Sequence, residues 1–413
     1  MEKTKIAILG FGSRGFTYAN IIMENPEEME LVAVCEINLA KKPLILHNYH
    51  LREDQFFTDY QEMLKKGKLA DILIISTMDR DHHDQALAAL EVGYDLLLEK
   101  PIATSRRECQ DILDKANQLK RKIAVCHVLR YTPFYQKLKE IISSGTIGEV
   151  VNMSQTENIG YYHYAHSYVR GNWRNEKTSG PIVLTKTCHD LDIIRWLIGK
   201  ECTAISSFGN LNYFKPDNAP QGSADYCYKC SLECPFNALD FYKKNPMWAM
   251  VFTLNPDVES VLRDEKCHYG RCVYHSDNNV CDHQVVNLEF ENLTTAQLTL
   301  TAFSNEIHRN LKIHGTKGEI EGDMEKAEII IKIFGKTPEV IDVSKLAVDF
   351  SGHAGGDKKM LIDFVRHLQA VKTGAASEAA IAGLTDINYS MESHFMAFDA
   401  EKSRLQGGKA ISR

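Results

Sequence analysis

Three glycines near the start of the chain have the spacing of a dinucleotide-binding turn. Gly10, Gly12 and Gly15 follow an apolar run at residues 5–9 and open an amphipathic stretch at residues 16–23. Gly10 allows a tight turn, Gly12 lets the backbone approach a pyrophosphate, and Gly15 permits close helix–strand packing. The N-terminus of the helix would then receive the phosphates. The alternative is a glycine turn without a cofactor. The predicted binding loop also contains Phe11, Ser13 and Arg14.

An acidic residue after the next strand-like run favours one nicotinamide dinucleotide over the other. The run at residues 31–35 ends on Glu36, which lies 21 residues after Gly15. A carboxylate there can accept hydrogen bonds from a ribose 2′-hydroxyl, whereas it would repel a 2′-phosphate. The sequence therefore predicts NAD rather than NADP.

A lysine and a histidine later in the chain could handle a proton. Lys100 follows a strand-like run and precedes Pro101, which fixes the turn. At the carboxyl end of a strand its charge would project into the ligand crevice and stabilise a developing alkoxide. His189 and Asp192 would share one helix face, so the carboxylate could orient the imidazole. The alternatives are a surface lysine and a satisfied core histidine.

The elements that must position these residues fall into two patterns. Strand-like runs at residues 6–9, 31–35, 72–76, 95–98 and 123–127 alternate with helix-like stretches, which indicates a doubly wound parallel α/β domain over residues 1–130. Later runs at residues 284–290, 295–303 and 329–334 alternate apolar and polar positions. They predict an α+β domain over residues 131–413 with an open, mainly antiparallel sheet. Residues 213–282 show little periodicity and are interpreted as an insertion.

Composition limits the class of protein. The chain has 413 residues, which is too long for one ordinary core, and its 44% hydrophobic and 25% charged content is that of a globular protein. A net charge of −7 argues against nucleic acid or an anionic membrane as the main partner. We see no signal-peptide pattern or membrane-length apolar run, and the cysteine count of 11 is odd. These features predict a cytoplasmic protein with reduced thiols.

Four ordered motifs resemble those of the Gfo/Idh/MocA oxidoreductases. They are the glycine turn, residues 76–82 with Thr77, Asp79 and His82, the Glu99-Lys100-Pro101 segment, and residues 188–192. The resemblance implies a Rossmann domain that binds NAD(P), followed by an α/β domain with an open sheet. It also implies action on sugars or polyols and a homo-oligomer, a dimer or tetramer, built through the sheet. Thr77, Asp79, His82, Glu99 and Lys100 are thereby expected at the cofactor.

The resemblance also implies that Lys100 and His189 act on the reacting hydroxyl. The chain departs from inositol-dehydrogenase-like members, which have an aspartate four residues before the histidine, because Thr185 stands there. Threonine cannot serve as a general acid or base at ordinary pH. If a second proton-handling group is needed, Lys186 or Asp190 must supply it.

Several segments could contact a substrate. Residues 161–174 are rich in aromatic, histidine and arginine side chains, which bind sugar rings and hydroxyl or anionic groups, although such a segment could instead pack between domains. Arg130 and Tyr131 follow the last strand-like run of the first domain, and His353 lies in a glycine-rich turn. The expected substrate-binding residues are Arg130, Tyr131, His163, His166, Arg170, Trp173, Arg174, Asp192 and His353.

The insertion contains a possible metal site. Cys227, Cys230 and Cys234 lie within eight residues, and a Cys-x₂-Cys pair suits tetrahedral zinc. Cys272 is the first choice for a fourth ligand, followed by Cys267 or Cys281. Structural zinc, an iron–sulfur cluster and metal-free thiols remain open at this point.

Three functions fit these observations. The leading one is an NAD-dependent oxidoreductase that transfers hydride between a sugar or polyol hydroxyl carbon and nicotinamide. The second is a redox-neutral NAD-dependent glycoside hydrolase that acts through a transient keto-sugar. The third is a non-catalytic NAD or ligand sensor, against which the intact Lys100 and His189 argue.

Overall fold

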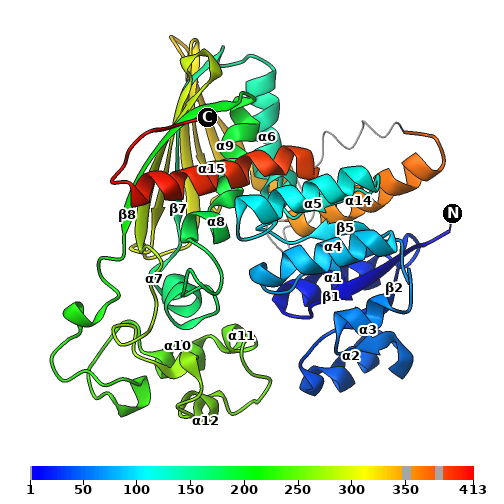
Figure 1. Ribbon diagram of the computed structural model, residues 1–413. Coiled ribbons are helices and arrows are strands. Elements are labelled where there is room, and N and C mark those ends of the chain that lie inside the picture. Colours follow the sequence, from blue (N-terminus) through cyan, green and yellow to red (C-terminus); the bar gives the residue numbers. More distant parts are fainter. Residues whose placement is uncertain (1, 347–354, 377–384) are drawn as a thin grey trace. The chain divides into compact units, whose positions relative to one another are not determined.

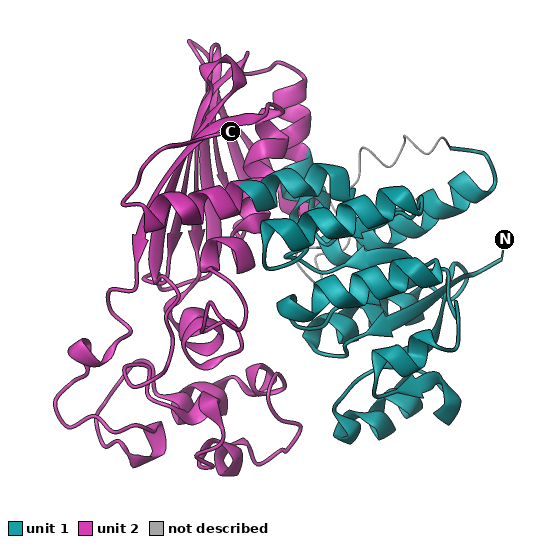
Figure 2. Cartoon of the chain, in the orientation of Figure 1, with its two compact units in different colours: residues 1–136, 346–395 teal, residues 137–345, 396–413 magenta. Residues whose placement is uncertain are grey.

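The computed structural model describes residues 2–346, 355–376 and 385–413, and the chain divides into two compact units. The first contains residues 1–136 and 346–395, and the second contains residues 137–345 and 396–413 (Figure 2). The sequence analysis ended the first domain near residue 130 and placed everything later in the second. In the structure, the described residues of this segment group with the N-terminal unit.

The first unit contains a parallel, six-stranded sheet in the order β3-β2-β1-β4-β5-β6. Its strands are almost continuous apolar runs, as expected for a parallel sheet covered on both faces. They are β1 (Thr4–Leu9), β2 (Met29–Cys35), β3 (Phe56–Phe57), β4 (Ile72–Ile75), β5 (Asp95–Leu98) and β6 (Ile123–Val125). The predicted doubly wound fold is confirmed, with β3 as an addition (Figure 1).

Helices connect these strands. They are α1 (Ser13–Glu24), α2 (Lys42–Asn48), α3 (Tyr60–Leu64), α4 (His82–Val92) and α5 (Arg106–Gln118). Local signals set their ends: Ser105 accepts a hydrogen bond from the Glu108 backbone N–H at the start of α5, and Gly93 ends α4 at a φ of 97°.

A late helix completes the first unit. Met360, Leu361 and Phe364 of α14 (Gly356–Lys372) share a buried core with Tyr18 and Ile22 of α1. This apolar stripe explains why residues distant in sequence join the N-terminal unit. Helix α15 (Ile387–Leu405) then begins in the first unit and ends in the second.

The second unit contains a nine-stranded sheet in the order β14-β13-β12-β11-β7-β10-β9-β8-β15. Its pairings are antiparallel except that β10 runs parallel to β7, so the predicted mainly antiparallel sheet is confirmed. The strands are β7 (Val150–Asn158), β8 (Cys202–Asn210), β9 (His283–Phe290), β10 (Thr295–Thr301), β11 (His308–Gly315), β12 (Gly318–Asp323), β13 (Glu328–Ile333), β14 (Glu339–Asp342) and β15 (Ile411–Ser412).

Short helices flank this sheet. Helix α6 (Pro133–Ser143) begins in the first unit, and α7 (Tyr161–Tyr164), α8 (Ile182–Thr185) and α9 (Cys188–Ile198) belong to the second. Residues 211–282 run between β8 and β9 and form α10 (Ala238–Lys244), α11 (Pro246–Ala249) and α12 (Val258–Leu262) around a small core of their own. Among the described residues, none of the helices has the length and apolarity needed to cross a bilayer.

Candidate active site

The turn between β1 and α1 has the three glycines in distinct steric environments. Gly10 has a φ of +88°, and a Cβ there would lie 2.7 Å from the Ser76 carbonyl oxygen. A Cβ at Gly15 would collide with the carbonyl oxygen of Gly10. A Cβ at Gly12, by contrast, would meet no protein atom within 4 Å. Gly10 and Gly15 therefore shape the turn, and Gly12 leaves open space beside it.

That open space lies at the N-terminus of α1. Gly12 is the N-cap residue and has no side chain to cover the first backbone N–H groups of the helix. Helix N-termini carry partial positive charge and unpaired donors, which suit an anion such as a pyrophosphate. The turn fits the phosphates of a dinucleotide.

Glu36 is held close to this turn. Its carboxylate accepts hydrogen bonds from the backbone N–H groups of Phe11 (2.9 Å) and Asn38 (2.8 Å), and Lys41 Nζ lies 3.1 Å from it. The residue is only 6% exposed. Glu36 therefore fixes the geometry of the glycine turn, and its contact with a ribose stays a prediction.

A buried polar network ties the glycine turn to β5 and α14. Arg14 donates from Nε to Glu99 Oε1 (2.5 Å) and from both Nη atoms to Asp357 (3.0 and 2.5 Å). The hydroxyl of Tyr18 donates to the same Glu99 oxygen at 2.7 Å. Arg14 and Glu99 were predicted to contact the cofactor directly. These partners fix both side chains at the turn, and their contact with the cofactor stays a prediction.

Charge in this network favours an ionised Glu99. Burial acts to raise the pKa of Glu99, but the charge and hydrogen bond of Arg14, the hydrogen bond from Tyr18 and the charge of Lys100 together leave that pKa below its ordinary value. Burial also raises the pKa of Tyr18, which therefore keeps its proton and can donate. The result is a fixed carboxylate immediately before Lys100.

Lys100 begins a turn whose backbone is held by contacts with two buried histidines. The Lys100–Pro101 peptide bond is cis. His82 Nδ1 lies 2.8 Å from the carbonyl oxygen of Pro101, and His394 Nε2 accepts the N–H of Ile102 at 2.9 Å. His394 Nδ1 in turn lies 2.8 Å from the Ser390 carbonyl oxygen, which fixes its neutral tautomer.

The contacts of this turn change the role predicted for His82 and add a residue, His394, that was not predicted. His82 was expected to contact the cofactor, but it is fully buried and supports the turn. His394 was missed, since it lies 292 residues beyond Ile102 and no local motif marks it.

The remaining predicted residues of the first unit have mixed placements. Thr77 is half-buried and donates from Oγ1 to Gln85 at 2.6 Å, and Asp79 is buried in a short helical turn. Tyr131 was expected at the crevice mouth. Its hydroxyl instead accepts the Thr385 N–H at 3.2 Å within the core, next to the buried Arg130.

In the second unit a row of buried charges crosses one face of the sheet. Lys186 Nζ lies 3.1 Å from Glu157 Oε1, and Arg309 bridges Glu157 (2.6 Å) and Asp190 (3.0 Å). Gln155 donates to the same Asp190 oxygen at 2.7 Å. Two cations and two anions therefore compensate one another next to α9.

These contacts separate the candidate proton-handling residues. Asp190 was predicted as a catalytic acid–base group, but it is fully buried against the sheet and has a positioning role. Burial raises its pKa, while Arg309 opposes that shift. His189 on the same helix is 8% exposed, Lys186 is partly exposed, and Asp192 is buried. Lys186 and His189 remain the candidates.

The aromatic segment around α7 presents one candidate side chain. His163 is partly exposed, and burial together with the charge of Lys186 lowers its pKa well below the ordinary value. The ring of Trp248, from the insertion, packs 5.2 Å from it edge-on. A neutral imidazole beside a lysine and an indole could bind a sugar hydroxyl.

Other residues of this segment make contacts within the second unit, and their binding of a substrate stays a prediction. His166 Nδ1 lies 2.6 Å from the Tyr242 hydroxyl, and the buried Arg170 donates to the carbonyl oxygens of Arg271 and Phe236. Arg174 pairs with Asp277, and Trp173 packs on a hydrophobic cluster. His353 lies outside the described residues.

Four of the cysteines line one small cavity in the second unit. Cys227, Cys230, Cys234 and Cys272 surround about 20 Å³ together with Arg170. All 11 cysteines are free thiols. Within the described residues, no three His, Cys, Asp or Glu side chains are already gathered at metal-binding separation.

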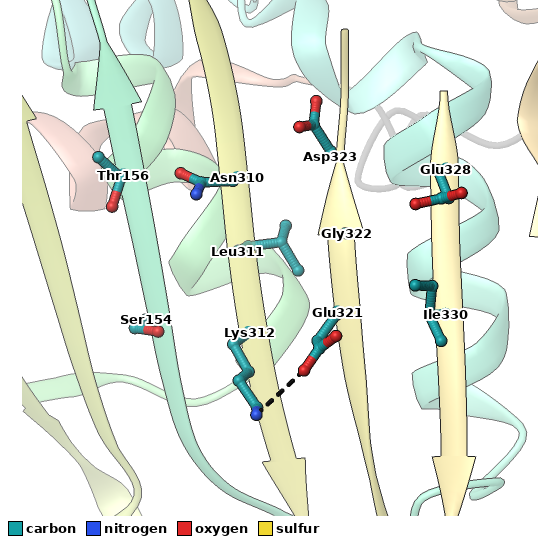
Figure 3. A pocket seen from close by; sticks show the side chains of 10 residues that line it. All are labelled: Ser154, Thr156, Asn310, Leu311, Lys312, Glu321, Gly322, Asp323, Glu328 and Ile330. Atoms are coloured by element: carbon teal, nitrogen blue, oxygen red, sulfur yellow. Dashed lines mark ion pairs between the residues drawn. The ribbon is translucent and has the colours of Figure 1, made fainter. Parts of the chain in front are cut away.

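A larger depression of about 340 Å³ lies on the second sheet. Figure 3 shows polar side chains of β7, β11, β12 and β13 around it, with Lys312 and Glu321 paired at 3.1 Å. Ser154 and Thr156 line it, whereas Gln155 and Glu157 alternate with them along β7 and contact the buried charges. The depression is therefore on the face opposite to those charges.

Comparison with known proteins identifies two matching family models. The model described as oxidoreductase family, NAD-binding Rossmann fold, matches residues 4–127, and its C-terminal alpha/beta domain matches residues 139–380. The two matches cover most of the chain.

Individual relatives are distant. A Bacillus subtilis protein, YteT, whose name assigns it provisionally to the oxidoreductases, is 26% identical over 80% of this chain and 78% of its own length. An inositol 2-dehydrogenase/D-chiro-inositol 3-dehydrogenase of Lactiplantibacillus plantarum is 25% identical over 52% of this chain and 56% of the enzyme. An inositol dehydrogenase homolog from Azotobacter vinelandii, solved with NAD⁺, superposes with a TM-score of 0.74 at 15% identity, covering 100% of this chain and 98% of that one.

Proposed function

Because the chain belongs to this NAD-binding family of oxidoreductases, we propose that it is a dehydrogenase that oxidises a secondary hydroxyl of a polyol or sugar. The observation that carries the proposal is the glycine turn, where open space at Gly12 meets the uncapped N-terminus of α1. The names of the inositol dehydrogenases support the substrate class. Those relatives match over little more than half of their own length, so the particular substrate stays open.

The residues that would hold the cofactor are those of the turn. Backbone N–H groups at the start of α1 would bind the pyrophosphate, and Glu36 would accept the ribose hydroxyls. When bound, NAD accepts the hydride of the substrate's carbinol carbon. Thr77 and Asp79 are proposed to border the cofactor.

Lys100 and His189 are proposed to manage the hydroxyl proton. The Lys100 ammonium stabilises the developing alkoxide, and the His189 imidazole accepts the proton. Glu99 and the buried histidines His82 and His394 hold the Lys100 turn, which limits the positions the ammonium can take. Lys186 is the second group that could relay a proton, since Glu157 anchors it while part of its side chain remains exposed.

His163 is proposed to contact a substrate hydroxyl, with Trp248 as the apolar wall. A sugar presents C–H patches and hydroxyl groups side by side, which matches an indole next to a neutral imidazole. The exposed part of Lys186 would add a donor.

The chain is further proposed to form a homo-oligomer through the open face of the second sheet. Ser154, Thr156 and Asn310 leave this face polar and accessible, and Val340, which pairs with Ile330 of the same face, is exposed. The free thiols support a reducing compartment such as the cytoplasm.

The experiment is a paired assay of the purified protein with NAD and a panel of polyols, free sugars and aryl glycosides. Absorbance at 340 nm reports NADH, and aglycone release is followed in the same samples. The dehydrogenase proposal predicts NADH with a polyol or sugar. Release without NADH would establish the hydrolase, and neither product across the panel would favour the sensor.

Lys100→Met tests the assigned chemistry. Loss of the ammonium removes proton handling and alkoxide stabilisation, so kcat should fall by about 10²–10⁴-fold while NAD affinity changes little. Lys66→Met, at an exposed lysine in the same unit, is the matched control and should leave kcat unchanged. An unchanged kcat in Lys100→Met would remove Lys100 from the mechanism.

A further inference from the structure

The four cysteines around the small cavity come from two segments that the fold brings together. Cys227, Cys230 and Cys234 follow one another along the chain, and Cys272 arrives from the far end of the insertion. An antiparallel bridge between Tyr226 and Arg271 aligns the two segments, and the Cys272 N–H donates to the Asp225 carbonyl oxygen at 2.9 Å. Backbone pairing therefore fixes which cysteine joins the group of three.

Two of the four sulfur atoms receive N–H donors. The Phe236 N–H donates to Cys234 Sγ at 3.4 Å. Arg170 Nη2 donates to Cys227 Sγ at 3.6 Å. Such donors stabilise thiolate charge and orient sulfur ligands around a metal. Packing of neutral thiols in an apolar cluster does not require such N–H donors.

We propose that these four thiolates bind one Zn²⁺ ion in a structural, tetrahedral site. Four sulfur ligands complete the coordination shell of zinc and leave no open position for catalysis. In their present positions these cysteines line a cavity of about 20 Å³, which has room for a single ion. Binding requires the side chains to rotate toward the cavity centre, since they are not gathered there without the ion.

The site would join two hydrophobic clusters. Cys227 belongs to the core of the insertion with Tyr242 and Tyr269, and Cys272 belongs to the cluster that contains Tyr164 of α7. The insertion has only a small hydrophobic core, so a zinc crosslink would supply stability that a larger buried area would otherwise provide. Because the insertion carries Trp248, zinc would also fix the indole against His163. This inference does not depend on the proposed dehydrogenase activity.

Metal analysis of the whole purified chain tests the proposal. We expect about one zinc per chain by inductively coupled plasma mass spectrometry, and release of that zinc as a mercurial reagent binds four thiols. Removal of zinc with a chelator should lower Tm, and added Zn²⁺ should restore it. Less than 0.2 zinc per chain after purification with added ZnCl₂, stoichiometric iron with acid-labile sulfide, or a disulfide between these cysteines would each overturn the proposal.

Two variants separate the site from the rest of the insertion. Cys272→Ser should reduce bound zinc at least fivefold, because serine is a poor zinc ligand at neutral pH. Cys267→Ser is the matched control, since this half-buried cysteine of the same insertion does not line the cavity, and it should retain full zinc. Equal zinc in both variants would contradict the ligand set even if Cys272→Ser folds poorly.

Discussion

Substitution of Gly12 by alanine adds a single methyl group, which should change the affinity for NAD without changing the stability of the fold. The Gly12 backbone has a φ of −78°, which any residue can adopt, and a Cβ there would touch no protein atom. Gly10 is different, because its φ of +88° and the nearby Ser76 carbonyl oxygen both exclude a side chain. The two glycines should therefore respond differently to the same substitution.

Gly12→Ala should leave Tm unchanged or slightly higher, because alanine fits the backbone and restricts the unfolded chain by about 0.4–1 kcal/mol. The methyl group would occupy the space of the pyrophosphate, so the Kd for NAD should rise about tenfold or more. Calorimetry of unfolding and titration with NAD measure the two effects.

Gly10→Ala is the comparison and should lose stability, by about 2–3 kcal/mol. If Gly12→Ala bound NAD as tightly as the parent protein, the pyrophosphate would not lie at the start of α1.

At the scale of elements, the docking of the insertion on the segment after α7 depends on a neutral histidine. His166 is buried between Tyr242, Trp248 and Tyr269. Burial, together with the charge of Arg170, lowers its pKa to about 4. A group whose pKa is depressed in the folded state stabilises the fold above its unfolded pKa, and that contribution disappears as pH falls through the folded value.

The free energy of unfolding should accordingly fall by about 3 kcal/mol between pH 6.5 and pH 4 from this residue alone. His166→Gln cannot titrate and should flatten that part of the profile, whereas His47→Gln, at an exposed histidine, should not. Denaturant unfolding at several pH values measures the slopes. Parallel profiles for His166→Gln and the parent protein would show that this imidazole is not held neutral.

The elements differ in how much the sequence reveals of them. The glycine turn and five of the six parallel strands are local patterns, so the sequence predicted where they lie along the chain, but not β3 or the order of strands in the sheet. The contacts of α14 and α15 were not, because Asp357 and His394 meet Arg14 and Ile102 only after more than 290 residues of chain. Types and spacing likewise could not show that Asp190, His166 and Arg170 face buried partners, since an identical side chain could equally face a ligand.

At the scale of the whole molecule, the candidate site residues are distributed over the two units. The first contains the glycine turn, Glu36 and Lys100, and the second contains His189, Lys186 and His163. Each set was assembled from within its own unit, by a parallel sheet in one and by a row of compensated charges in the other.

The central claim is that hydride passes from a substrate carbinol to NAD. The most direct measurement is mass spectrometry of the cofactor after incubation with NAD and polyols deuterated at the carbinol carbons. The account predicts one deuterium in the reduced cofactor, with none lost to water, and strong suppression of this transfer in Lys100→Met. Substrate deuterium exchanged into solvent while all cofactor remains oxidised would contradict it.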